Sequence, residues 1–352
     1  MKFTISATNL ATALKLAAAA TSRKSPMPML ACVMLRVDGA KLTICGTDTV
    51  TSVTATCAVT GGANGSAAIP ADDLMRMVAS VDDSIAITAD DKEATIAIGK
   101  KIRARLPTLP SKDYPKMPSV AGEWQGVDAS ALSSALSIAQ VSACVDETRF
   151  HLCGVHLDGV NYVATDGHRM HVVTGPSVAT GAIVPLRGVA EIVRAVSDHE
   201  VCDVAIAGGF MHVRTVASLT TVKLIDAQFP PWRQVQATRD RRIATVPRAD
   251  MIAALGRAKR YATTNGIAVT LADSAMSIVG KHPDRGDYSE DIELAAPWEG
   301  KLITLGLNPD YLADALRTSH DDDAVLSFGG ELDPVGVFGS NASATLMPTR
   351  IG

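Results

Sequence analysis

Asp166 and His168 stand two residues apart in the segment Asp166-Gly-His168, and a carboxylate beside an imidazole could exchange protons with a substrate. Such chemistry also needs a nucleophile, a metal or a phosphate-binding loop, each of which has a recognisable spacing. The chain contains no Gly-x-x-x-x-Gly-Lys-Ser/Thr, no Gly-x-Ser-x-Gly and no His-Glu-x-x-His. We therefore expect a non-enzymatic protein in which Asp166 and His168 belong to a turn.

The cysteines give no metal or redox signal. They include no Cys-x-x-Cys pair and no histidine at zinc-finger spacing, so we expect small core residues, no metal and no cofactor. The six are Cys32, Cys45, Cys57, Cys144, Cys153 and Cys202.

The chain has 352 residues, 47% of them hydrophobic and 20% charged, which suits two or three globular domains. No apolar run is long enough for a membrane span, and the start Met1-Lys-Phe-Thr-Ile5 does not resemble a secretory signal, so we expect a cytoplasmic protein. The net charge of −4 does not exclude nucleic acid, because the 33 basic residues could gather on one face.

Three internal repeats set the fold class. In each, a short apolar strand leads to a proline at a helix start and an amphipathic helix of about three turns. The copies are Ser66-Ala-Ala-Ile-Pro70 before 71–78, Ala182-Ile-Val-Pro185 before 186–193, and Leu307-Asn-Pro309 before 310–316. The repeats predict three domains, 1–121, 122–241 and 242–352.

Further markers support the same register. Thr43-Ile-Cys-Gly-Thr47-Asp48 matches Tyr162-Val-Ala-Thr165-Asp166, each a strand that runs into a turn. Leu109-Pro-Ser-Lys-Asp-Tyr-Pro115 parallels Leu224-Ile-Asp-Ala-Gln-Phe-Pro230, and Leu346-Met-Pro348 stands at the corresponding end of the third repeat.

Each repeat also begins with a helix. Ser6 and Asp128 are placed to cap the first two, and the third begins near Arg248. Alternating segments such as 33–37 and 94–98, with turns such as Gly61–Ser66 between them, predict antiparallel strands. We expect an α+β fold with two helices packed on antiparallel sheets and about eight strands in each repeat.

Three alternatives remain at this point. One is a monomeric three-repeat protein of another role, the second is an enzyme, and the third is a sequence-specific DNA-binding protein. The last would need a recognition helix that reads base edges, and no short helix-turn-helix pairing is visible.

The sequence resembles the bacterial DNA polymerase III beta sliding clamp family over its full length. The most specific segments are Ala164-Thr-Asp-Gly-His-Arg-Met170, Lys223-Leu-Ile-Asp-Ala-Gln-Phe-Pro230 and Leu346-Met-Pro-Thr-Arg350, after the opening Met1-Lys-Phe-Thr and Pro28-Met-Leu30. The resemblance implies three DNA-clamp domains per chain and a head-to-tail homodimeric ring that encircles duplex DNA and tethers polymerases. A phage- or plasmid-encoded homologue that serves a specialised polymerase is the alternative within the family.

Two oppositely charged segments would form the dimer interface of such a ring, with one edge strand pairing to the other. The basic edge comprises Lys100, Lys101, Arg103 and Arg105, and the acidic edge comprises Glu290, Asp291 and Glu293.

Duplex DNA would be held through its phosphates, without sequence specificity. The expected DNA-binding residues lie on helices or in loops of all three repeats. They are Lys15, Arg23, Lys24, Arg76, Arg149, Phe150, His151, Arg187, Arg194, Arg257 and Arg317.

Partner proteins would insert a short peptide with an apolar anchor into a cleft where the second repeat meets the third. The expected partners are the DNA polymerase III alpha subunit, clamp-loader subunits and other proteins with a clamp-binding motif, and no membrane is involved. The resemblance assigns to this cleft Leu152, Thr165, Gly167, His168, Arg169, Met170, Pro230, Val235, Asn308, Tyr311, Val335, Leu346, Met347, Pro348, Thr349 and Arg350.

Overall fold

The computed structural model describes residues 1–79, 81–99, 102–120, 122–239, 242–263, 266–319 and 321–350, and the chain divides into two compact units. Unit 1 comprises Met1–Ser133 and Arg187–Leu224, and unit 2 comprises Ser134–Leu186 and Ile225–Gly352. All strand pairings described below are antiparallel.

Unit 1 contains two sheets. Its elements are β1 (Lys2–Ser6), α1 (Ala7–Ala19), β2 (Cys32–Asp38), β3 (Lys41–Thr47), β4 (Thr51–Ala58), β5 (Thr60–Ala63), β6 (Gly65–Pro70), α2 (Ala71–Val78), β7 (Ser84–Ala89), β8 (Glu93–Ile98), β9 (Ile102–Pro107), β10 (Gln125–Asp128), β13 (Val201–Ala207), β14 (Phe210–Arg214) and β15 (Ser218–Lys223). The strand orders are β5-β1-β7-β8-β9 and β10-β13-β14-β15-β4-β3-β2-β6. Helix α4 (Leu186–Val196) lies in this unit apart from its first residue.

Unit 2 also contains two sheets. Its elements are β11 (Gly154–Thr165), β12 (Arg169–Pro185), β16 (Arg242–Pro247), α5 (Arg248–Ala258), β17 (Ile267–Ala272), β18 (Ala275–His282), β19 (Gly286–Glu293), β20 (Ile303–Leu307), α6 (Pro309–Arg317), β21 (Asp323–Phe328), β22 (Val335–Phe338) and β23 (Ala342–Leu346). The strand orders are β11-β12-β23-β22-β21-β16 and β19-β18-β17-β20. Helix α3 (Ala129–Ala139) runs from unit 1 into unit 2.

Short 3₁₀ helices connect these elements. They are η1 (Pro28–Ala31), η2 (Ser111–Asp113), η3 (Gln140–Ser142), η4 (Glu147–Leu152), η5 (Trp232–Gln234) and η6 (Lys259–Tyr261).

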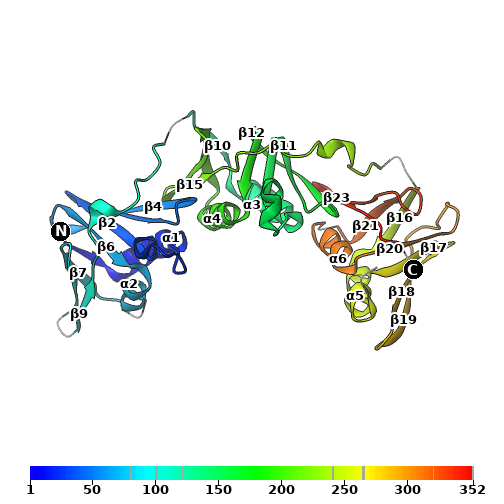
Figure 1. Ribbon diagram of the computed structural model, residues 1–352, viewed down its shortest axis with the longest axis horizontal. Coiled ribbons are helices and arrows are strands. Elements are labelled where there is room, and N and C mark those ends of the chain that lie inside the picture. Colours follow the sequence, from blue (N-terminus) through cyan, green and yellow to red (C-terminus); the bar gives the residue numbers. More distant parts are fainter. Residues whose placement is uncertain are drawn as a thin grey trace. The chain divides into compact units, whose positions relative to one another are not determined.

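The helices form where capping and periodicity predicted them. Ser6 accepts a hydrogen bond from the Asn9 N–H at the start of α1, and Asp128 accepts one from the Ala131 N–H at 2.7 Å at the start of α3. Leu10 and Leu14 of α1 are fully buried, as their spacing predicts. Within unit 1, α1 and α2 lie side by side, and within unit 2 so do α5 and α6 (Figure 1).

The repeats share a turn as well as a pattern of elements. A residue with left-handed backbone stands at the same point in all three, namely Gly39 (φ 58°), Gly159 (φ 67°) and Asp273 (φ 47°). Glycine adopts this conformation without strain, and aspartate is among the side chains that tolerate it. The β2–β3 hairpin, the middle of β11 and the β17–β18 hairpin are therefore equivalent.

Two sheets run across the predicted repeat boundaries. In unit 1, β4 of the first repeat pairs with β15 of the second, from Thr51↔Val222 to Ala55↔Ser218. In unit 2, β12 of the second repeat pairs with β23 of the third, from Arg169↔Leu346 to Val173↔Ala342. We call these two pairings the first and second sheet joints.

Two details differ from the sequence expectation. The described residues contain nine strands in the first repeat (β1–β9), six in the second (β10–β15) and eight in the third (β16–β23), because the long β11 and β12 replace several shorter strands. The segment predicted as a turn at Gly61–Ser66 instead contains the edge strand β5, which pairs with β1, and the start of β6.

Candidate functional site

The loop between β11 and β12 is held rigidly at the second sheet joint. Thr165 Oγ1 donates to the carbonyl oxygen of Arg169 at 2.6 Å, and Asp166 Oδ1 accepts from the backbone N–H groups of His168 and Arg169 at 2.9 and 3.0 Å. Gly167 lies at φ 88°, where a glycine is unstrained. The loop therefore presents His168 and Arg169 in a fixed position.

Arg169 connects this loop to helix α6. Its guanidinium forms ion pairs with Asp166 at 3.1 Å and with Asp314 at 2.7 Å, and it stacks 4.3 Å from the centre of the Tyr311 ring. The arginine side chain is only 14% exposed, so water screens these interactions less than on an open surface. Tyr311 is thereby fixed as a wall residue rather than left free to rotate.

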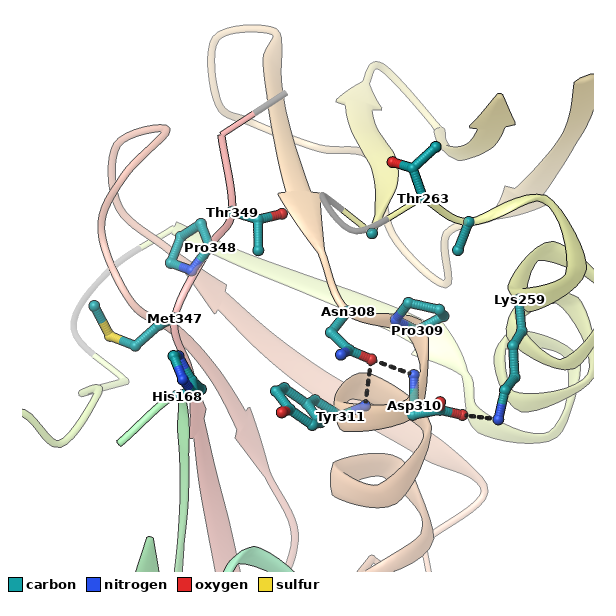
Figure 2. Close-up of a pocket in the computed structure, with 12 residues that line it drawn as sticks. His168, Lys259, Thr263, Asn308, Pro309, Asp310, Tyr311, Met347, Pro348 and Thr349 are labelled. Atoms are coloured by element: carbon teal, nitrogen blue, oxygen red, sulfur yellow. Dashed lines mark hydrogen bonds and ion pairs between the residues drawn. The ribbon is translucent and has the colours of Figure 1, made fainter. Parts of the chain in front are cut away.

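A cavity of about 410 Å³ opens beside Tyr311. Figure 2 shows His168, Met347 and Pro348 on one side of it, Thr263 and Lys259 on the other, and Asn308 and Tyr311 between them. Its walls combine apolar surface from prolines, methionine and the tyrosine ring with a few polar groups, which is the usual composition of a site for a short peptide or small ligand.

The start of helix α6 forms the floor of the cavity. Asn308 Oδ1 caps the helix by accepting from the backbone N–H groups of Asp310 and Tyr311 at 2.9 and 3.4 Å. Asp310 forms an ion pair of 2.7 Å with Lys259, at the end of α5. The cavity is therefore built where two helices of the third repeat meet the loop of the second.

The C-terminal segment forms one wall. The Thr349 N–H donates to the Gly306 carbonyl oxygen at 2.9 Å, and the Met347 N–H donates to the His168 carbonyl oxygen at 2.9 Å. A Cβ atom at Gly306 would lie 2.5 Å from Thr349 Oγ1, so only glycine allows this close approach. The tail is thus attached to strand β20 and to the β11–β12 loop.

Six of the residues expected in the partner cleft line this cavity: His168, Asn308, Tyr311, Met347, Pro348 and Thr349. Four others are core residues instead: Leu152 (6% exposed) at the end of η4, and Met170 (3%), Val335 (1%) and Leu346 (1%) on strands that turn them inward. The remaining six, which are not among the lining residues, are Thr165, Gly167, Arg169, Pro230, Val235 and Arg350. Among these, Thr165 and Arg169 support the lining, as described above, and Val235 is 56% exposed.

Sequence reasoning missed half of the lining. The additional residues are Lys259, Ala262, Thr263, Gly266, Pro309 and Asp310. Pro309 and Asp310 adjoin Asn308 at a helix start that the sequence did reveal, so that start was a usable signal. The others follow α5, and no local pattern indicates that the end of α5 approaches α6.

His171 is a core histidine, three residues after His168. It is fully buried on β12, and burial lowers its pKa to about 4, with the neighbouring Arg169 acting in the same direction. Its Nδ1 shares a hydrogen bond with Ser142 Oγ, while its Nε2 has no partner among the described residues. The imidazole is therefore neutral near pH 7.

Most of the arginines expected to bind DNA already have a carboxylate partner. Arg187 forms an ion pair with Asp48 at 2.6 Å, and each of five other arginines forms an ion pair within its own unit. The five pairs are Arg23–Asp72, Arg149–Asp146, Arg194–Glu191, Arg257–Glu290 and Arg317–Asp314.

Three basic residues of this group stay available. Lys15 on α1, Lys24 beyond it and Arg76 on α2 are exposed and form no ion pair with a described residue. In the η4 segment, Phe150 is 55% exposed and packs edge-on against His151, with 5.9 Å between the ring centres. An arginine that is already paired adds little net charge, so we expect weak attraction for DNA.

The two charged edges are sheet edges. Strand β9 carries Arg103 and Arg105, both exposed, at the edge of its sheet, whereas Lys100 and Lys101 lie outside the described residues. Strand β19 is the edge of the four-stranded sheet and exposes Asp291 and Glu293.

Glu290 of β19 has a different environment. It accepts hydrogen bonds from Arg257 and Tyr288, which lower the pKa of its carboxyl. Two residues expected in different sites, Arg257 for DNA and Glu290 for the interface, therefore pair with each other at 2.5 Å.

Within the described ranges, no three His, Cys, Asp or Glu side chains are grouped so that they could hold a metal ion. None of the helices described is both long and apolar enough to cross a membrane.

Three family models match consecutive parts of the chain. They describe the DNA polymerase III beta subunit N-terminal domain at residues 1–118, its central domain at 126–231 and its C-terminal domain at 233–350. The curated relatives include the beta sliding clamp of Vibrio cholerae, 27% identical over 343 residues and 93% of each chain, and that of Pseudomonas putida, 28% identical over 333 residues and 90% of each chain.

Solved structures agree on the fold. The pol III beta structure from Caulobacter crescentus has a TM-score of 0.93 at 24% identity and covers 100% of both chains.

Proposed function

The chain belongs to the DNA polymerase III beta subunit family, since the three family matches span almost all of it, and we propose that two copies form a ring that encircles duplex DNA and tethers polymerases. Proteins of this family are accessory processivity factors of replication rather than catalysts. The protein is a sliding clamp built from three clamp domains of α+β structure.

The observation that carries the ring is the pattern of the two sheet joints. In each joint, the second strand of a hairpin in one repeat (β4 or β12) pairs with the last strand of the next repeat (β15 or β23). Two equivalent strands do not take part in either joint. They are β19, the second strand of the β18–β19 hairpin, and β9, the last strand of the first repeat. Both are sheet edges, so one copy can offer β19 to β9 of a second copy and close a two-chain ring with the same joint.

Charge supports this pairing. Arg103 and Arg105 project from β9, and Asp287, Asp291 and Glu293 project from β19. Opposite charges across a strand pair stabilise it, and like charges would oppose the pairing of two identical edges. The combination therefore favours a head-to-tail contact over a head-to-head one.

Duplex DNA would pass beside the helices, where Lys15, Lys24 and Arg76 offer unpaired positive charge. The other basic side chains are shared with carboxylates, and phosphate contacts carry no sequence information. Weak contacts of this kind suit a ring that slides and is retained by its topology.

Partner proteins would bind in the cavity beside Tyr311. An apolar side chain such as leucine could contact Met347, Pro348 and the tyrosine ring, while Asn308 and Lys259 remain near peptide polar groups. The partners that we propose are the polymerase III alpha subunit and clamp-loader subunits, which share one cleft and therefore compete for it.

Native mass spectrometry of the full chain tests the ring. We expect two chains per particle at micromolar concentration, and dissociation into single chains only on strong dilution. A particle of one chain under all conditions, or an open series of larger assemblies, would contradict the closed head-to-tail pairing.

A further inference from the structure

The first sheet joint reproduces the backbone of the second joint in detail. Thr47 Oγ1 donates to the Thr51 carbonyl oxygen at 2.9 Å, just as Thr165 donates to Arg169. Asp48 Oδ1 accepts from the N–H groups two and three residues later, at 3.0 and 2.6 Å, as Asp166 does in its own loop.

The strands are also joined at the same point. The Lys223 N–H donates to the Val50 carbonyl oxygen at 2.8 Å, and the Met347 N–H donates to the His168 carbonyl oxygen at 2.9 Å. Lys223 is therefore the counterpart of Met347, a wall residue of the partner cleft.

Thr49 shows that the first joint keeps this turn at a cost. It has φ 79°, in the position where the second joint has Gly167 at φ 88°. A β-branched residue is strained in this conformation. The turn is thus maintained even where the sequence does not favour it.

A cavity of about 510 Å³ opens at the first joint, wholly within unit 1. It is lined by the β3–β4 turn, residues 115–119, the β13–β14 turn and Lys223. The segment 115–119 begins at the proline that the sequence repeats as Pro230, so the cavity combines counterparts of the parts that surround the second joint.

The chemistry of this cavity differs from that of the partner cleft. Lys116 and Lys223 are both exposed on its walls and pair with no carboxylate among the described residues. The carboxylate of the turn, Asp48, is already paired with Arg187 at 2.6 Å. The cavity therefore presents uncompensated positive charge beside the half-buried Met117 and Phe210.

The cavity and helix α4 lie on opposite faces of the sheet. Val222 of β15 packs directly against Gly188 of α4, and successive side chains of a strand point to opposite faces, so Lys223 points away from this helix. Because DNA is expected on the helix side, the occupant expected here is a protein segment.

From this we propose that the cavity at the first sheet joint is a second partner site, which binds a short peptide with carboxylates beside one apolar side chain. The carboxylates would contact Lys116 and Lys223, and the apolar side chain would pack between Met117 and Phe210. The proposal goes beyond the sliding-clamp function and does not depend on the cleft beside Tyr311.

Methionine-methyl NMR of the full-length protein can separate the two sites, because Met117 lines the first cavity and Met347 lines the second. The probe is an acetylated eight-residue peptide with three acidic residues around one leucine. We expect it to shift the Met117 methyl signal with a dissociation constant below about 1 mM. Lys116→Glu with Lys223→Glu should weaken this shift about tenfold or more.

The matched control is Lys112→Glu, an exposed lysine of the same connecting segment that does not line the cavity, and it should leave the shift unchanged. Tyr311→Ala should also leave it unchanged, although it would weaken a peptide in the second cavity. The proposal is overturned if the Met117 signal does not respond at about 1 mM peptide. It is equally overturned if the lysine double variant binds as well as the parent, or if only single-stranded DNA shifts the signal.

Discussion

Reversing the charge of the β9 edge should separate the two chains of the ring. Arg103 and Arg105 are both exposed on β9, so Arg103→Glu with Arg105→Glu disturbs no core. In the proposed joint these side chains approach Asp287, Asp291 and Glu293 of the second copy. The double substitution therefore turns attraction into repulsion at both interfaces.

The expected size follows from exposed ion pairs. Such a pair contributes about 0.2–1 kcal/mol, and a repulsive pair costs a similar amount. Two residues that switch from attraction to repulsion change each interface by about 1–4 kcal/mol, and the ring has two interfaces. The dissociation constant of the dimer should therefore rise at least about 30-fold.

Sedimentation velocity over a dilution series measures this change. Adding Asp291→Lys and Glu293→Lys to the double variant should restore the dimer, since the charges are then exchanged. Lys41→Glu with Lys112→Glu, on exposed positions away from both edges, is the control for the change in net charge. A double variant that remains as tightly dimeric as the parent would refute the β9–β19 joint.

Met347→Ala should lower the affinity for an apolar partner peptide roughly tenfold in fluorescence anisotropy, because a contact with the cavity wall is lost. The control Met27→Ala, at a methionine that is 51% exposed, should leave the affinity unchanged. Equal effects of the two substitutions would exclude the cavity as the peptide site. Gly306→Ala should displace the tail and weaken the same peptide, and an unaltered affinity would show that the tail is no wall. His171 binds its proton in the unfolded chain near pH 6.5 but in the folded chain only near pH 4, so its contribution to stability is lost as pH falls through this window. His171→Gln should reduce that loss by up to about 3 kcal/mol in urea unfolding, and parallel curves for parent and variant would contradict the assignment.

Local patterns were sufficient for the helices and for the edge charges. The caps Ser6 and Asp128 and the spacing of Leu10 and Leu14 are properties of adjacent residues, so they could be recognised without tertiary structure. The charge of β9 is likewise visible as a run of basic residues. The repeat markers also identified the loop at Asp166 correctly.

Long-range pairing could not be predicted in the same way. Nothing in the segment 51–58 indicates that it pairs with 218–223, and the ion pair between Arg257 and Glu290 joins residues 33 positions apart. Met170 is buried because β12 pairs with β23 in a sheet that both repeats share, whereas the sequence motifs alone placed it on a cleft wall. The motifs indicated which segments lie around this cavity, while the direction of each side chain required the fold.

Retention on DNA of different topology tests the sliding-clamp account most directly. The protein is loaded by a clamp loader onto a nicked circle and onto a linear fragment of equal length, and the bound amount is followed as salt is raised to about 1 M, where charge attraction is screened beyond roughly 3 Å. A ring should remain on the circle and slide off the linear ends at every salt concentration. Equal, salt-dependent loss from both substrates would contradict topological retention.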